Sequence, residues 1–266
     1  MQRVDLKKID HDVKTGEICP YIKPNITDDS VFYIDDEAVG FYIRKMPENM
    51  LKLAEVSNSE FRSNRVPKSK MNRSDTVKAV KDGASYKDAA KFGVSQYSTI
   101  LGSTPPRPHM RRPYGSISSV HSNPSTKMFV KSMLLLERES GKIIQRILPK
   151  QYARQQELMS EIPEKWKFGS LFTSSISNYN ISAGFHRDNG NLQGAVNVII
   201  CKRSNAIGGD LHIPDYNATI DQVDGSMLVY PAWRNVHGVT PIEATHEGGY
   251  RNTFIFYALK AFKNLE

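Results

Sequence analysis

Two histidines and one aspartate in the last third of the chain have the spacing of a metal site. His186 and Asp188 form an H-x-D pair, and His237 follows 51 positions after His186. Because side chains at i and i+2 of a strand project to one face, His186 and Asp188 are expected to point together, with Arg187 facing away. Two imidazoles and one carboxylate leave three positions of an octahedral ion open, which suits oxygen chemistry at non-haem Fe(II). We therefore predict His186, Asp188 and His237 as metal ligands and catalytic residues.

An arginine after the second histidine adds a site for a co-substrate. Arg251 lies 14 positions after His237 and opens an apolar run of residues. A dicarboxylate that chelates iron through its keto acid needs its far carboxylate neutralised, and a bidentate arginine does this. Thr253 lies on the same face of the predicted strand and adds a hydroxyl donor. An H-x-D pair alone is more often a surface pair or a core histidine, but together with Arg251 it indicates iron and a dicarboxylate.

Short strands are predicted to position these side chains. By β-branched and aromatic content they are expected at 170–179, 183–188, 195–201, 209–213, 226–230, 236–240 and 251–259. Turn residues separate them at Gly208-Gly209-Asp210, Pro214-Asp215 and Asp224-Gly225-Ser226. Residues 127–161 have helical periodicity in two pieces, broken near Pro149. The order predicts an α+β fold, a small antiparallel barrel or jelly roll with helices on one face.

The N-terminal half is predicted to be less regular. The first sixty residues read as turns and short strands, with strands at 30–34 and 40–44. Residues 61–74 look like an exposed loop, and 75–92 have helix-like spacing. The proline-rich connector 104–114 is expected to be extended and stiff.

One further segment has spacing similar to a helix-turn-helix, at 89–100. Its second helix would run only from Gln96 to Gly102 before Pro105 and Pro106 end it. We therefore favour an ordinary helix followed by a loop.

Composition sets wider limits on the class of protein. The 266 residues are 39% hydrophobic, enough for a real core in one large or two modest domains. We predict an N-terminal extension at 1–125 and a catalytic core with its helices at 126–266. No stretch approaches a membrane span, and the N-terminus lacks an apolar signal region. Cys19 and Cys201 are the two cysteines, which fits a reducing cytoplasm and excludes a disulfide framework.

The net charge of +8 is concentrated in one segment. Residues 62–125 carry 12 basic and 3 acidic side chains, a net charge of +9. Clustered lysine and arginine favour a polyanion through counterion release. A solvated basic surface that aids solubility is the alternative, and composition favours the two equally.

From about Gly169 to Leu259 the pattern resembles the 2-oxoglutarate/Fe(II)-dependent oxygenase superfamily, whose core is a double-stranded β-helix of the jelly-roll or cupin type. The resemblance implies Fe(II) at the three predicted ligands, and hydroxylation of a C–H bond by O2 with release of succinate and CO2. It also implies that Arg251 and Thr253 hold 2-oxoglutarate. Asn178, Asn180 and Asn197 are polar residues on predicted barrel strands. Asn180 and Asn197 could reach the co-substrate, or they could be strand-end amides with local partners.

Two segments, Leu171–Asn180 and Tyr230–His237, look similar to phage-type members of the TET/JBP branch, which oxidise the 5-methyl group of a pyrimidine in DNA. This likeness implies 5-methylcytosine or thymine in DNA as substrate, in a bacterial or phage-infected cell. The chain lacks the cysteine-rich region of the animal enzymes, so residues 62–125 are expected to contact DNA, with the base flipped out. The residues predicted to contact DNA or wall the pocket are Arg62, Arg65, Lys68, Lys70, Arg73, Arg107, Arg111, Arg112, Tyr230 and Trp233. For Tyr230 and Trp233, core packing is the alternative.

Two other classes of function stay open. An oxygenase with the same core could act on a protein side chain, an amino acid or another small molecule. A non-catalytic binding module is the third class. It is disfavoured because a pseudoenzyme has no physical reason to keep all three ligands and Arg251.

Overall fold

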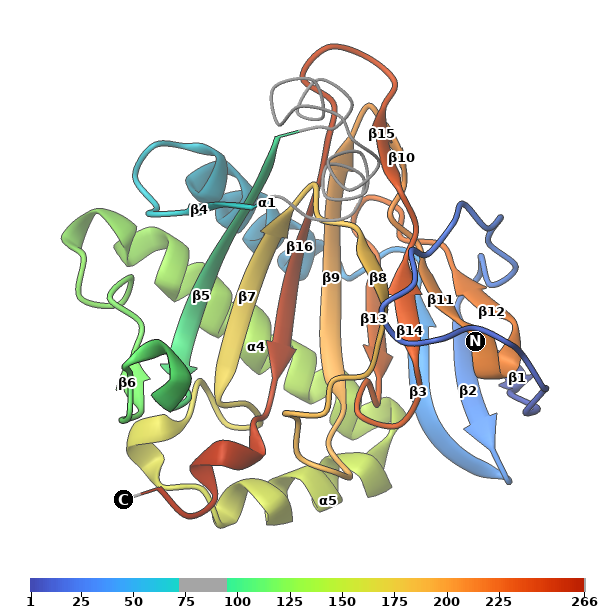
Figure 1. The fold of residues 1–266 in the computed structure, drawn as a ribbon, viewed down its shortest axis with the longest axis horizontal. Helices are drawn as coiled ribbons and strands as arrows, with labels where there is room; N and C mark the ends of the chain where they lie inside the picture. Colours follow the sequence, from blue (N-terminus) through green and yellow to red (C-terminus); the bar gives the residue numbers. More distant parts are fainter. Residues whose placement is uncertain (72–94, 266) are drawn as a thin grey trace.

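A large, mostly antiparallel sheet forms the frame of the molecule, and the computed structural model describes residues 1–71 and 95–265 (Figure 1). Its strands lie in the order β1-β2-β3-β13-β9-β16-β7-β5-β4, with β6 paired to β5. They are β1 (Gln2–Asp5), β2 (Ser30–Ile34), β3 (Glu37–Ile43), β4 (Ser69–Met71), β5 (Gln96–Thr104), β6 (Ser116–Ile117), β7 (Ser174–Tyr179), β9 (Asn197–Ser204), β13 (Met227–Tyr230) and β16 (Tyr250–Tyr257). N-terminal strands thus extend both edges of the sheet that β13, β9, β16 and β7 build.

A smaller sheet lies over the β9–β13 part of the large one in Figure 1, in the order β12-β11-β14-β8. Its strands are β8 (Ala183–His186), β11 (Leu211–Ile213), β12 (Ala218–Ile220) and β14 (His237–Val239). A two-stranded pair, β10 (Ala206–Gly208) and β15 (Ile242–Ala244), projects beyond it. The two sheets form the double-stranded β-helix of an α+β fold. All seven strands predicted after residue 169 are present, while the three-residue strands β10, β12 and β15 were missed.

Helices cover the opposite face of the large sheet (Figure 1). They are α1 (Glu48–Arg62), α4 (Lys127–Ile147) and α5 (Pro149–Ser160), with 3-10 turns at Pro108–Met110, Pro124–Thr126, Glu164–Trp166, Pro214–Tyr216 and Lys260–Phe262. In α4, Phe129, Met133 and Leu136 recur at helical spacing and are buried in the main core. Pro149 occupies the first turn of α5, where its missing N–H costs nothing. The two predicted helices are confirmed. Within the described residues, no helix has the length and apolar character to cross a membrane.

Strand β16 divides its side chains between the helices and a cavity. Phe254 and Phe256 are fully buried in the core that α4 completes. Arg251, Thr253 and Ile255 alternate with them and line a cavity between the two sheets. The alternation follows from the two-residue period of a strand, and it places the predicted co-substrate residues on the interior face.

Two predictions for the N-terminal half are wrong. Residues Glu48–Arg62 form a helix, α1, because Met50 and Ala54 supply an apolar face four residues apart. The run 61–74 is not a simple exposed loop in its described part, since Phe61 and Val66 are buried and β4 pairs with β5.

Two further predictions fail beyond residue 95. Gln96–Gly102 is neither a recognition helix nor a loop, but belongs to strand β5, which pairs with β7. The connector 104–114 is not extended, because Arg107 and Arg112 exchange two backbone hydrogen bonds and reverse the chain. The helix predicted at 75–92 and the first half of the helix-turn-helix pattern lie almost wholly outside the described residues.

Candidate active site

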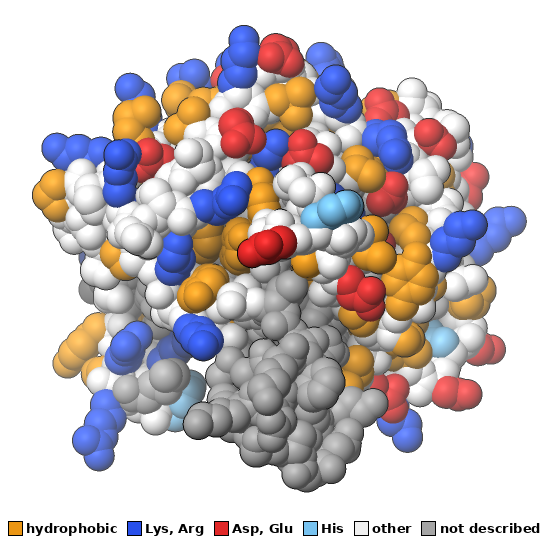
Figure 2. All heavy atoms as spheres, turned by 90° about the horizontal axis from the view of Figure 1, so that it is seen from above, with side chains coloured by type: hydrophobic (Ala, Val, Ile, Leu, Met, Phe, Trp, Pro, Cys, Tyr) orange, Lys and Arg blue, Asp and Glu red, His pale blue; other side chains and the backbone are white. Residues whose placement is uncertain are grey.

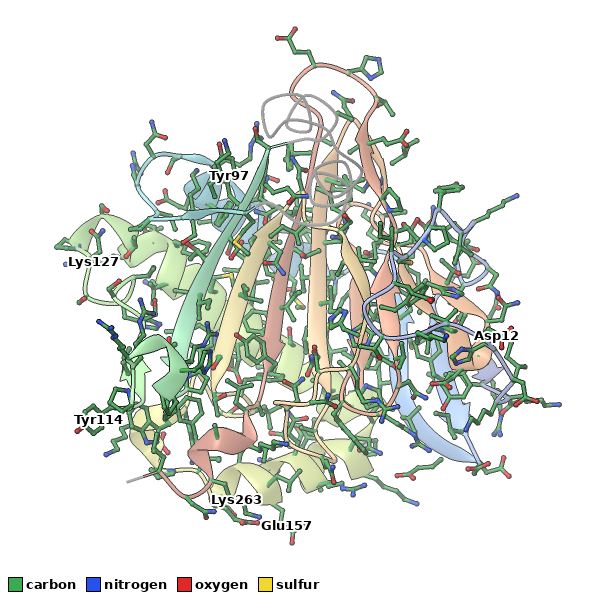
Figure 3. All side chains as sticks on the ribbon, viewed as in Figure 1. Asp12, Tyr97, Tyr114, Lys127, Glu157 and Lys263 are labelled. Carbon is green, nitrogen blue, oxygen red and sulfur yellow. The ribbon has the colours of Figure 1, made fainter. Side chains whose placement is uncertain are left out.

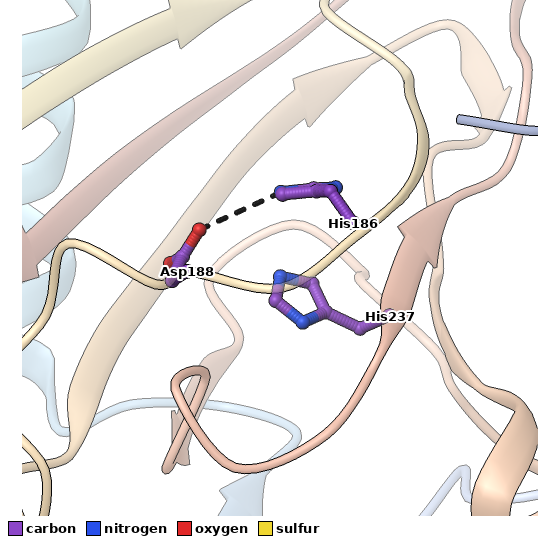
Figure 4. A group of neighbouring side chains, drawn as sticks. All are labelled: His186, Asp188 and His237. Carbon is purple, nitrogen blue, oxygen red and sulfur yellow. Dashed lines mark ion pairs between the residues drawn. The ribbon is translucent and has the colours of Figure 1, made fainter. Parts of the chain in front are cut away.

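The two histidines face each other across neighbouring strands of the smaller sheet. His237 of β14 is directly opposite His186 of β8 in the antiparallel register, and their ring centroids are 4.5 Å apart. Asp188 lies just after the end of β8, where its backbone N–H donates to the carbonyl of Ala232. One potential ligand atom from each of the three residues lies within 4.8 Å of the others, and among the described residues no other group of this kind occurs. The structure therefore brings the three predicted ligands together (Figure 4).

Backbone carbonyls fix the orientation of both imidazoles. Nδ1 of His186 is 2.8 Å from the carbonyl of Gly184, and Nδ1 of His237 is 3.1 Å from the carbonyl of Asn235. With Nδ1 donating to a carbonyl, Nε2 keeps its lone pair for a metal. Burial, followed by the proximity of His186, lowers the pKa of His237 to about 4. His237 is therefore a neutral imidazole at neutral pH.

Two amides orient the carboxylate. Asn197 Nδ2 donates to Asp188 Oδ2 at 3.1 Å, and Asn191 Nδ2 lies 3.3 Å from the same oxygen. Asn191 also donates to Asn197 Oδ1 at 2.9 Å, so the two amides support each other. The second oxygen, Oδ1, faces His186 Nε2 at 3.6 Å, a spacing that one ion with bonds of about 2.1 Å can bridge. Two imidazoles and a carboxylate fit Fe(II).

Residues 16–19 contact both strands that carry the histidines, β8 and β14, a contact that the sequence did not predict. Phe185, next to His186, exchanges backbone hydrogen bonds with Gly16 and Glu17 at 2.7 and 2.8 Å. Beside the other histidine, a Cβ on Gly238 would lie 2.7 Å from Cys19 Cβ, so only glycine allows this approach. Residues 16–19 thus cover the outer edge of the smaller sheet. Figure 3 shows the neighbouring Asp12 on this side of the molecule.

A cavity of about 580 Å³ extends from the histidines along the inner face of the large sheet. Four of its lining residues lie in register across β9, β16, β7 and β5: Ile199, Ile255, Ile176 and Ile100. This row makes an apolar floor. Polar side chains lie on either side of it, with Arg251 and Thr253 towards one end and Tyr257 and Asn197 towards the other.

Arg251 is 4% exposed and points into the cavity from β16. Burial lowers the pKa of its guanidinium, which nevertheless stays charged as arginine does in proteins. Its Nε has no hydrogen-bond partner among the described residues. Gly209 has φ +74°, and a Cβ there would lie 2.3 Å from Arg251 Cδ. The predicted Gly-Gly turn therefore also makes room for the arginine.

Several predicted residues line the cavity and others do not. Those that line it are His186, Asp188, His237, Arg251, Thr253, Asn178, Asn197, Tyr230 and Arg107, with the exposed Arg187 at its rim. Asn180 does not. Its side chain accepts from the backbone N–H of Arg251 at 2.8 Å and donates to the carbonyl of Ser95. Trp233 is also outside, with its indole donating to the carbonyl of Ala195. These contacts match the alternatives considered for the two residues, a strand-end amide with local partners for Asn180 and packing for Trp233.

The described part of the predicted basic segment divides into two groups at opposite ends of β5. Lys70 is opposite Tyr97 at the start of β5, and Arg107 follows its end. Nine residues at about 3.3 Å each separate the groups by roughly 30 Å. Figure 3 shows Tyr97 and Tyr114, which mark the two groups, far apart in the molecule. Of these two described groups, the one after β5 adjoins the cavity.

The first group is largely used within the protein. Lys68 Nζ donates to the carbonyls of Phe61 and Ser63 and so caps the C-terminus of α1. Arg62 lies over the ring of Tyr250, and Arg65 pairs with Glu60. Lys70 lies on the exposed strand β4, and Arg73 is outside the described residues.

Sequence reasoning missed Tyr257 and Gln222, which both line the cavity. Tyr257 could have been found, because it continues the alternation from Arg251 through Thr253. Gln222 lies in the loop between β12 and β13, and no local signal marks it.

A family model described as "Oxygenase domain of the 2OGFeDO superfamily", Tet_JBP, matches residues 107–260. Among solved structures, NgTET1 in complex with 5mC DNA is similar, with a TM-score of 0.59 and 12% identity over 96% of this chain and 85% of that chain. An oxidoreductase of the 2OG-Fe(II) oxygenase family from Burkholderia pseudomallei also matches (TM-score 0.43, 11% identity, 83% of this chain and 88% of that chain). So does a full-length Neurospora crassa protein in complex with alpha-KG (TM-score 0.41, 11% identity, 83% of this chain and 75% of that chain). A comparison with curated protein sequences found no match.

The family match covers more than half of the chain and includes both histidines, Asp188 and Arg251. It confirms the superfamily and the TET/JBP branch that the sequence motifs predicted. The protein is a dioxygenase that uses Fe(II), 2-oxoglutarate and O2. The chain belongs to the Tet/JBP family of oxygenase domains in the 2OGFeDO superfamily.

Proposed function

We propose that this dioxygenase hydroxylates the 5-methyl group of a pyrimidine in DNA, 5-methylcytosine or thymine, after the base has left the helical stack. One atom of O2 enters the methyl C–H bond to give the alcohol, and the other enters succinate as 2-oxoglutarate loses CO2. The observation that carries the proposal is a preformed arginine loop whose first residue, Arg107, lines the metal cavity.

The arginine loop, residues 107–112, is closed by its own backbone. Arg107 N donates to Arg112 O at 2.6 Å, and Arg112 N donates to Arg107 O at 3.1 Å. Arg111 at the tip has φ +57°, and both Arg111 and Arg112 are exposed. Arg107 itself lines the cavity. Three cations held on one tight turn that adjoins the cavity suit the phosphates that flank a flipped nucleotide.

The inner wall of the cavity suits a base. Ile100 and Ile176 offer an apolar floor, while the Asn178 amide offers a donor and an acceptor for a base edge. Tyr257, whose pKa is raised by burial and by the nearby Asp188, adds an aromatic ring. A volume of about 580 Å³ admits small molecules but not a stacked duplex.

The solved structure of NgTET1 contains 5mC DNA, which supports the same class of substrate for this chain. On one face of the molecule, the charge pattern favours a local DNA contact over a broad one. On the face in Figure 2, lysine and arginine side chains are interspersed with aspartate and glutamate. The arginine loop is therefore the part of the described residues that we propose contacts DNA.

Each side chain of the centre has a proposed task. His186, Asp188 and His237 hold Fe(II), which when bound activates O2 for C–H hydroxylation. Arg251 and Thr253 would bind the far carboxylate of 2-oxoglutarate, and Ile255 lies between them and the Tyr257 end of the strand. Asn197 keeps Asp188 oriented, and Tyr230, 6.0 Å from the His237 ring, excludes water on that side.

The test is anaerobic loading with Fe(II) and 2-oxoglutarate, followed by O2 and methylated or unmethylated DNA. Mass spectrometry of the nucleosides should show a hydroxymethyl pyrimidine formed in proportion to succinate. Replacing Arg107, Arg111 and Arg112 by glutamine should raise the KM for DNA at least about 10-fold, because binding weakens with each cation that no longer neutralises a phosphate.

A matched control replaces three exposed lysines of the helical face, Lys127, Lys131 and Lys150, by glutamine. This change removes the same charge and should leave the KM nearly unchanged. Succinate release without any modified nucleoside would overturn the DNA proposal and favour an oxygenase of a small molecule or a protein side chain.

A further inference from the structure

Four of the nine buried side-chain atoms that lack a hydrogen-bond partner in the described residues line one cavity. Among the described residues, the buried atoms without a hydrogen-bond partner that belong to cavity-lining side chains are Gln222 Nε2 and Oε1, Arg251 Nε and Tyr230 Oη. Buried polar groups are normally paired, and leaving one unpaired is costly. Gln222 stands out because both ends of its amide are unpaired while the residue is 1% exposed. Such a side chain points to a ligand that supplies the missing partner.

The backbone of Gln222 is fixed at three points. Its N–H donates to Asp210 Oδ1 at 2.9 Å. Its carbonyl accepts from Arg203 Nη1 at 2.9 Å and from Cys201 Sγ at 3.2 Å. The loop is therefore anchored, and only the side-chain amide is left without a partner as it faces the cavity.

The same contacts place Gln222 at the Arg251 end of the cavity. Cys201, which donates to the Gln222 carbonyl, is directly opposite Thr253 in the β9–β16 register. Cys201 also lies against the Arg251 side chain. Asp210, which accepts from Gln222 N–H, follows Gly209, the residue that Arg251 packs against. The unpaired Gln222 amide and the unpaired Nε of Arg251 thus lie at the same end of the cavity.

We propose that Gln222 is a binding and specificity residue for 2-oxoglutarate, donating from Nε2 to the carboxylate that Arg251 holds. This inference rests on the proposed role of Arg251 but not on DNA as substrate. A carboxylate has about four acceptor positions, and an arginine fork satisfies two of them. A neutral amide adds a donor without adding a second buried cation, which would be uncompensated when the co-substrate leaves. Glutamine therefore suits a site that fills and empties in each turnover.

The test compares Gln222→Met with the wild type by calorimetry. 2-Oxoglutarate is titrated into the Fe(II)-loaded protein under anaerobic conditions. Methionine keeps the length of the side chain but cannot donate, so 2-oxoglutarate should bind about 10- to 100-fold more weakly. 2-Oxopentanoate, which has the same five carbons without the far carboxylate, should bind wild type and variant equally. Gln222→Glu should weaken 2-oxoglutarate binding further, because two carboxylates then face each other.

Stability supplies a second readout. Removing an unpaired buried amide costs no hydrogen bond, so Gln222→Met without co-substrate should be at least as stable as the wild type. The matched control is Gln155→Met, because Gln155 is equally buried but bonded to Leu171 O at 2.7 Å and Val196 N at 2.9 Å. That variant should lose stability and keep its affinity for 2-oxoglutarate.

Unchanged 2-oxoglutarate affinity in Gln222→Met would overturn the inference, and so would an equal loss for both keto acids. A wild type that binds 2-oxoglutarate normally yet modifies no nucleoside would defeat the DNA proposal alone. A wild type that binds no 2-oxoglutarate would defeat the role proposed for Arg251 and, with it, that of Gln222.

Discussion

The two ends of the cavity differ in how far the chain satisfies its own polar atoms. At the metal end, His186 and His237 each direct Nδ1 to a backbone carbonyl, and Asp188 accepts from two asparagines. At the other end, Arg251 Nε and both amide atoms of Gln222 have no partner among the described residues. Tyr230 is the exception at the metal end, since its Oη is unpaired as well.

This difference indicates two ways of building a binding site. The metal end is oriented by the protein before an ion arrives, which keeps the ligands in place at little further cost. The proposed co-substrate end would complete its hydrogen bonds only with a ligand, so that binding there would relieve the desolvation of its polar atoms. The comparison predicts that substitutions at the metal end weaken Fe(II) binding, whereas substitutions at the Arg251 end weaken 2-oxoglutarate binding.

The largest effect is expected from removing a proposed ligand. His237→Ala should lower Fe(II) affinity and turnover by more than about 100-fold, because loss of even an outer-shell partner costs 10- to 100-fold. Fe(II) bound per protein can be measured by competition with a chromogenic chelator. His246→Ala, at an exposed histidine in the β15–β16 loop, is the control and should bind iron normally. Normal iron binding by His237→Ala would show that His237 is not an iron ligand.

An intermediate effect is expected at Asn197, which donates to Asp188 but is not a proposed ligand. Asn197→Ala should weaken Fe(II) binding about 10- to 100-fold, because the carboxylate loses a donor that orients it. Titration with Fe(II) under anaerobic conditions measures this. Asn58→Ala, which removes a buried amide bonded to Tyr250 in another part of the protein, should lower stability and leave iron affinity intact. Equal iron affinities in the two variants would show that the metal end is not preorganised by Asn197.

The sequence was informative where structure follows from local pattern. His186 and Asp188, two residues apart, were expected on one face, and Thr253 was expected beside Arg251 by the same period. Both pairs line the cavity. The strands around them were recognised because β-branched residues and glycine turns alternate at short range.

The errors have a long-range origin. Gln96–Thr104 contains the β-formers Tyr97, Thr99 and Ile100, but its helix-turn-helix spacing favoured a helix and loop; pairing with β7 makes it strand β5. Because α1 was not foreseen, Lys68 was assigned to phosphate when it caps that helix. Gln222 could not be found, since its position depends on the loop after β12 folding beneath the co-substrate corner.

The smallest effect on the cavity is expected from Glu137, a buried carboxylate of α4. Substituting it tests whether the helices behind the large sheet influence ligand binding in the cavity. Glu137 accepts from the backbone N–H groups of Ser170 and Leu171 at 2.9 and 3.0 Å, ahead of β7. Burial outweighs these bonds and raises the pKa of Glu137 above 4.5. Its stabilising contribution is therefore complete below pH 4.5 and is lost as the pH rises through the raised folded pKa.

Glu137→Gln keeps an acceptor for the two N–H groups but cannot ionise. Chemical unfolding between about pH 4 and pH 7 should show the wild type losing stability relative to the variant as pH rises, by on the order of 1 kcal/mol for each unit by which the pKa is raised. Parallel pH profiles would contradict the role of Glu137. Fe(II) and 2-oxoglutarate affinities should stay at wild-type values, because Glu137 lies on the face of the large sheet away from the cavity. A change in either affinity would mean that the helices, as well as the asparagines and backbone carbonyls, set the geometry of the metal end.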